Sequence, residues 1–69
     1  MNASTTEIAS EMKTLLAANY AITKRGLYFT AEQFANEKVI YLLRMQLRRI
    51  VGDAKAEQIH KNCFPKRTA

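Results

Sequence analysis

The segment from residue 31 to residue 51 constrains the fold more than any other part of the sequence. It contains no Gly or Pro and is rich in Leu, Met, Arg, Glu and Gln, which are good helix formers. Thr30 and Gln33 have the T-x-x-Q spacing of a capping box, and Phe29 and Phe34 have the spacing of a hydrophobic staple. The sequence therefore predicts a helix over residues 31–51, about five to six turns long.

An earlier helix is predicted by a second capping signal. Ser4 and Glu7 have the S-x-x-E spacing of a capping box, so the helix should begin near Thr5. Apolar residues follow at helical spacing, namely Ile8, Met12, Leu15 and Leu16. Lys24, Arg25 and Gly26 form a stop signal, and the pattern allows a helix over 5–19 or over 5–25.

The C-terminal part leaves two alternatives open. Gly52 and Asp53 either break the long helix, with Asp53 capping a third helix over 54–63, or lie within one continuous helix. Pro65 ends the last helix, and residues 65–69 form a basic tail. The prediction is a single all-α domain over residues 1–69, a helical hairpin of two to three helices.

The apolar residues of the long helix indicate a homodimer. They occupy about half of its circumference, which is wider than a helix with one short neighbour needs. A single core in a chain below roughly 70 to 80 residues is weak, and one Cys cannot form an intramolecular disulfide. We therefore expect part of this face to pack on the first helix and part on a second copy, unless a third helix folds back to cover it. The predicted dimer interface comprises Val39, Ile40, Leu43, Leu47 and Ile50.

The opposite side of the same helix carries a candidate partner-binding surface. Aromatic and Met side chains form a narrow stripe there at helical spacing, and cations flank the stripe on both sides. Tyr, Met and Arg are enriched where proteins bind proteins, although long Arg side chains also cover solvated faces. The candidate partner-binding residues are Phe34, Lys38, Tyr41, Arg44, Met45, Arg48 and Arg49.

Residues for catalysis or metal binding are sparse in the sequence. His60 and Cys63 lie three residues apart on a predicted helix, but two ligands do not make a metal site. No Gly-rich loop or orienting carboxylate accompanies them. We expect no enzymatic activity, no cofactor and no metal.

The charge balance suggests an anionic partner. The chain has 11 Lys and Arg against 6 Asp and Glu, a formal net charge of +5. A basic protein of this kind binds either nucleic acid or acidic protein surfaces. No stretch approaches the length of a membrane span, and residues 1–7 lack the features of a signal peptide. We therefore expect a cytoplasmic protein without a membrane partner.

A small DNA-binding regulator of the helix-turn-helix type is the alternative function. Residues 28–35, Tyr-Phe-Thr-Ala-Glu-Gln-Phe-Ala, resemble the opening of the first motif helix in excisionase-like regulators. Such motifs turn sharply after two helical turns, whereas residues 39–42, Val-Ile-Tyr-Leu, continue the helical pattern through that point. The resemblance therefore covers about eight residues.

The size and layout of the whole chain resemble those of small early proteins that phages use to disable host factors. The chain is similar to the Pseudomonas phage anti-activator of quorum sensing. The similarity lies in a short helix, a long helix with an apolar face and a net positive charge. The resemblance implies a phage protein that inhibits a host LuxR-type transcription factor by blocking its DNA binding. It also implies a pilus-assembly ATPase as a second partner.

Overall fold

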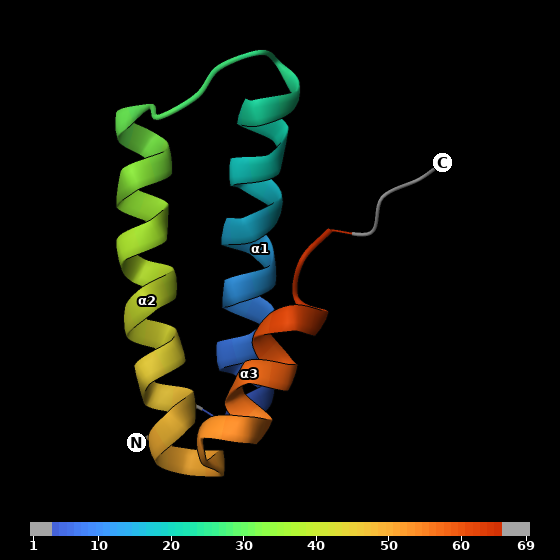
Figure 1. Ribbon diagram of the computed structural model, residues 1–69, viewed down its shortest axis with the longest axis vertical. Helices are drawn as coiled ribbons and strands as arrows, with labels where there is room; N and C mark the ends of the chain where they lie inside the picture. The colour runs from blue at the N-terminus through green and yellow to red at the C-terminus, as the bar shows by residue number, and fades with distance from the viewer. Residues whose placement is uncertain (1–3, 66–69) are drawn as a thin grey trace.

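The structure is a computed structural model that describes residues 4–65. It contains three helices, α1 (Thr5–Lys24), α2 (Ala31–Val51) and α3 (Asp53–Asn62), and no strand within residues 4–65. Helices α1 and α2 run antiparallel, side by side, and α3 folds back along the end of the hairpin that lies away from the connecting loop (Figure 1). The all-α prediction is confirmed.

Local capping signals determine where α1 and α2 begin. The backbone N–H of Glu7 donates to Ser4 Oγ at 3.1 Å. In α2 both bonds of the capping box are present, from Gln33 N–H to Thr30 Oγ1 at 3.1 Å and from Thr30 N–H to Gln33 Oε1 at 3.0 Å. These bonds satisfy backbone donors that a helix start otherwise leaves unpaired. The predicted starts at Thr5 and residue 31 are confirmed.

The structure also decides between the alternatives at the helix ends. Helix α1 continues to Lys24, so the longer form is the right one. Gly52 separates α2 from α3 with φ 87° and ψ 165°, a conformation essentially restricted to glycine. Asp53 is the first helical residue of α3 and makes no capping bond, so the prediction that it caps this helix is wrong. The predicted basic tail lies outside the described residues except for Pro65.

The core lies between the three helices. Its fully buried members include Ile8 and Met12 of α1 and Leu47 of α2, and α3 adds Ala56. The other buried side chains of this cluster are Leu16, Ile40, Leu43 and Cys63. None of the helices among residues 4–65 is long and apolar enough to cross a membrane.

The core changes the dimer interface expected from the sequence. Ile40, Leu43 and Leu47 are buried within one chain, because α1 and α3 cover that side of α2. They are therefore removed from the candidate interface. Val39 and Ile50 remain exposed, so the third helix folds back without covering the whole apolar arc.

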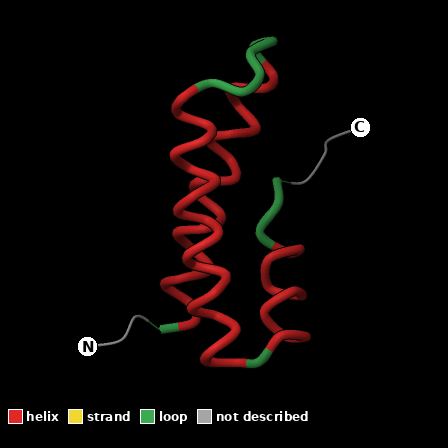
Figure 2. Tube along the Cα trace, turned by 60° about the vertical axis from the view of Figure 1, so that its left-hand side comes forward, coloured by secondary structure: helices red, strands yellow, loops and turns green. Residues whose placement is uncertain are grey.

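A polar cluster joins α1 and α2 near the connecting loop. Asn36 Nδ2 donates to Asn19 Oδ1 at 2.8 Å, and Gln33 Nε2 donates to the Asn19 carbonyl at 3.3 Å and to Thr23 Oγ1 at 3.0 Å. Helix α3 stops short of this end of the hairpin (Figure 2). These polar contacts therefore join α1 and α2 at the loop end, in addition to the buried side chain of Ile22.

Candidate functional site

The outer face of α2 presents three of the predicted partner-binding side chains as a stripe. Phe34 and Tyr41 are 61% and 58% exposed, and Met45 is half-buried. Arg48 Nη1 lies 3.9 Å from Met45 Sδ, so its guanidinium borders the stripe. Lys38, Arg48 and Arg49 are exposed. We call Phe34, Tyr41 and Met45 the outer stripe.

Arg44 lies apart from the outer stripe. Its guanidinium forms an ion pair with Glu57 of α3 at 3.8 Å, and the residue is half-buried. The side chain therefore helps to dock α3 on α2. A surface ion pair of this kind contributes at most about 1 kcal/mol. The sequence pattern placed Arg44 with the other cations because it contained no information about the position of α3.

A second exposed surface of α2 is apolar and lies beside the outer stripe. Val39, Leu42 and Ile50 are each at least one-third exposed, and Leu42 reaches 57%. A shallow hollow of about 340 Å³ lies between Val39, Leu42 and Arg49. We call Val39, Leu42 and Ile50 the apolar face.

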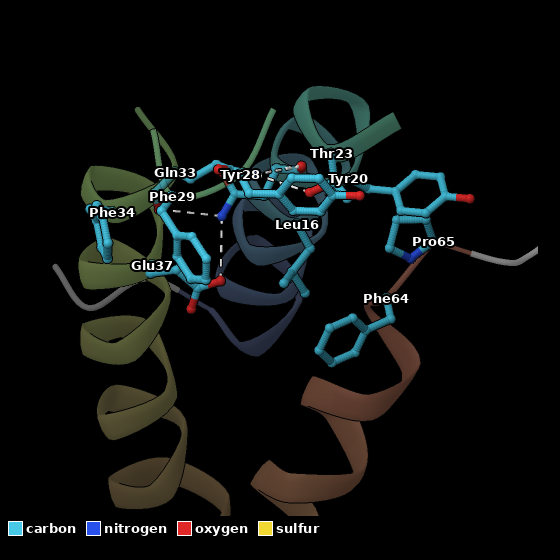
Figure 3. Close-up of a pocket in the computed structure, with 11 residues that line it drawn as sticks. Leu16, Tyr20, Thr23, Tyr28, Phe29, Gln33, Phe34, Glu37, Phe64 and Pro65 are labelled. Atoms are coloured by element: carbon cyan, nitrogen blue, oxygen red, sulfur yellow. Dashed lines mark hydrogen bonds between the residues drawn. The ribbon is translucent and has the colours of Figure 1, made fainter. Parts of the chain in front are cut away.

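A larger hollow of about 440 Å³ lies at the loop end of the hairpin. Figure 3 shows side chains of α1, the loop, α2 and the segment that follows α3 arranged around it. Its lining includes five aromatic side chains, those of Tyr20, Tyr28, Phe29, Phe34 and Phe64. We call it the aromatic hollow. The hollow is not predicted by the sequence, because its walls come from segments far apart in the chain. The Phe29–Phe34 staple is the one local signal for it.

Phe29 has an unusual backbone and an unusual exposure for an aromatic residue. Its φ is 57°, in the left-handed region, which is a genuine outlier for a bulky side chain. Its side chain is 81% exposed and stacks on Phe34 with ring centroids 6.3 Å apart. Backbone strain of this kind occurs often at ligand-binding positions. Phe29 is therefore the most distinctive residue of the aromatic hollow.

His60 lies in the last turn of α3 and Cys63 directly follows this helix, and the contacts of each side chain are with other residues. Burial, together with the nearby Arg44 guanidinium, lowers the pKa of His60, and its ring packs edge-on against Phe64 at 4.9 Å. Burial raises the pKa of the Cys63 thiol, which favours the unreactive protonated form. In the part of the chain that the structure describes, no three His, Cys, Asp or Glu residues are grouped to hold a metal ion.

Searches with protein-family models, against curated proteins and against solved structures found no match. Three surfaces of the described residues remain as candidate sites. These are the outer stripe of α2, its neighbouring apolar face and the aromatic hollow.

Proposed function

We propose that the chain is a non-catalytic protein-binding inhibitor that contacts its partner through the outer stripe of α2. The observation that carries this proposal is the exposure of Tyr41, a large aromatic side chain, in the middle of a long and regular helix. Buried aromatic anchors supply much of the affinity at protein interfaces. A helix with such anchors on one face fits a groove of a partner.

The cations beside the outer stripe define the rim of the proposed interface. Lys38, Arg48 and Arg49 are exposed and surround Tyr41 and Met45. Charges at a rim mainly accelerate association and select partners of opposite charge. The proposed partner therefore has an apolar groove with carboxylates at its edge.

The resemblance in size and layout to phage inhibitors suggests the identity of that partner. We propose a host transcriptional regulator of the LuxR type, whose DNA binding the chain blocks, and a pilus-assembly ATPase as a second target. The helix-turn-helix alternative is weakened because α2 runs without interruption through residues 39–42.

A homodimer is part of the same proposal. The apolar face of α2, with Val39, Leu42 and Ile50, remains exposed after α1 and α3 have packed. Small chains often gain stability by association, and a twofold axis would place this face against its own copy. The outer stripe would then be presented twice, once by each protomer.

A gel shift with a purified LuxR-type regulator and its operator tests the proposed function. The wild-type chain should release the operator from the regulator, and Tyr41→Ala should weaken its binding to the regulator by about 2 kcal/mol, roughly thirtyfold. Arg48→Ala should cost less and should mainly slow association. Gln58→Ala, at an exposed position on α3, is the matched control and should bind like wild type.

Two outcomes would contradict the proposal. If Tyr41→Ala releases the operator as well as the control does, the outer stripe is not the interface. If the chain itself shifts random duplex DNA and loses about a thousandfold of affinity between 50 and 200 mM salt, it is a DNA-binding protein.

A further inference from the structure

The aromatic hollow has walls that favour a cation. Four of its rings, those of Tyr28, Phe29, Phe34 and Phe64, are at least half exposed. Aromatic faces carry negative charge density and attract ammonium and guanidinium groups. The chain already contains one such contact, because Lys24 Nζ lies 5.6 Å from the centroid of the Tyr20 ring.

Glu37 supplies a negative charge to the same hollow. It is the one charged residue among those that line it, and in the view of Figure 3 its carboxylate lies below the ring of Phe29. One carboxylate oxygen accepts from Asn19 Nδ2 at 3.4 Å. A carboxylate has about four acceptor sites, so Glu37 retains capacity for further donors.

No Lys, Arg or His side chain within residues 4–65 forms an ion pair with this carboxylate. Within residues 4–65 the ion pair present is that of Arg44 with Glu57, and Glu37 is not part of it. His60 lies near enough to interact electrostatically with Glu37, but the lowered pKa of His60 favours its neutral form near pH 7. The hollow therefore combines aromatic walls with a carboxylate that has no ion-pair partner among the described residues.

We propose that the aromatic hollow binds an arginine side chain of a partner protein, with its guanidinium paired to Glu37 and stacked against the rings of Tyr28 and Phe29. A planar guanidinium suits this site better than an ammonium group, because it stacks on rings and donates two parallel bonds to a carboxylate. A purely apolar occupant would bury the Glu37 carboxylate without a partner, which is costly. The volume of about 440 Å³ accommodates the side chain and part of its flanking backbone.

This site is distinct from the interface proposed around Tyr41. The two surfaces share Phe34, but Tyr41 does not line the hollow and Glu37 is not part of the outer stripe. Variants at Tyr41 and Glu37 therefore test the two proposals separately.

Binding of N-acetyl-arginine methylamide to the full chain, followed by NMR of backbone amides, tests the proposal. Saturable shifts are expected for the amides of residues 28–37. The citrulline analogue, which has nearly the same shape without the charge, should bind about tenfold more weakly. Glu37→Gln should reduce the affinity for the arginine compound to that for citrulline. Glu32→Gln, an exposed glutamate of the same helix outside the hollow, should leave the affinity unchanged.

A second variant protects the test against a folding defect. Tyr28→Ala changes an exposed side chain of the loop and should weaken arginine and citrulline binding alike, because it removes stacking area from both. Equal affinity for arginine and citrulline in the wild type would overturn the proposal. So would tighter binding of the leucine analogue, which would make the hollow an apolar site.

Discussion

The thiol of Cys63 donates to the backbone carbonyl of Ala9 at 3.4 Å, across 54 residues of sequence. The contact joins the end of α3 to the early turns of α1. Helix α3 has 10 residues, too few for an isolated helix to be stable in water. Its helical form therefore depends on docking, to which Cys63 and Ala56 contribute their buried side chains.

The docking of α3 should control the reactivity of Cys63. The thiol is buried and its pKa is raised by burial, so little reactive thiolate is exposed in the folded chain. We expect a soluble disulfide reagent to modify Cys63 at least about tenfold more slowly in buffer than in denaturant, since reaction requires local opening. The absorbance of the released thiol measures the rate. Equal rates in both conditions would show that α3 does not stay docked.

The strain at Phe29 predicts an inverted order of two substitutions. Phe29→Gly and Phe29→Ala both remove the ring, but only Gly accepts a φ of 57° without a steric penalty. The Gly variant should therefore be more stable than the Ala variant by about 1 kcal/mol, whereas Ala is normally the more stable of the two in a helix or strand. Urea midpoints of the two variants measure the difference. If the Ala variant is the more stable, Phe29 does not adopt the left-handed conformation in solution.

The helices could be predicted from the sequence because their start signals are local. The capping box depends on two residues that lie three positions apart, Thr30 and Gln33. The hydrophobic staple depends on two apolar residues on either side of the same helix start, Phe29 and Phe34. The positive φ of Phe29 had no such signal, because the usual markers of that conformation are Gly and Asn.

The surfaces could be predicted only in part because they depend on how the helices pack. The pattern in α2 identified an apolar arc, but its division into core and apolar face depends on where α1 and α3 lie. Leu43 and Val39 belong to the same arc, yet Leu43 is buried and Val39 is exposed. The aromatic hollow combines Tyr20, Glu37 and Phe64, whose proximity follows from the tertiary fold alone.

The pH dependence of stability should come from His60 between pH 7.5 and 5.5. His60 is the one histidine of the sequence, and burial followed by the positive charge of Arg44 lowers its pKa from 6.5, against smaller opposing effects of Glu57 and Glu37. The unfolded chain therefore binds a proton more readily than the folded chain. Stability from this group is fully present above pH 6.5 and is lost as the pH falls toward the lowered pKa.

Urea unfolding at pH 7.5 and at pH 5.5 measures this effect. The wild type should be less stable at pH 5.5, and most carboxylates do not titrate in this range. His60→Gln should show a smaller decrease or none. An equal decrease in the variant and the wild type would assign the pH dependence to groups other than His60.

The apolar face of α2 leads to a prediction about oligomeric state. Leu42 is 57% exposed in the single chain and forms this face together with Val39 and Ile50. Replacing it with Lys removes no core contact, so Leu42→Lys should keep the helical circular dichroism of the wild type. In a dimer packed through this face the same change would bury two ammonium groups close to the twofold axis, which is strongly unfavourable.

Sedimentation at micromolar concentration separates the effect of Leu42→Lys on association from its effect on folding. The wild type should have twice the mass of one chain, and its melting temperature should rise with concentration, because association stabilises only the folded state. Leu42→Lys should sediment as a single chain and should melt at a concentration-independent temperature. Gln58→Lys, which adds the same charge at an exposed position of α3, is the matched control and should remain dimeric. If Leu42→Lys also sediments at twice the chain mass, the apolar face does not form the dimer. If the wild type sediments as a single chain, the three-helix core is sufficient by itself to keep the protein folded.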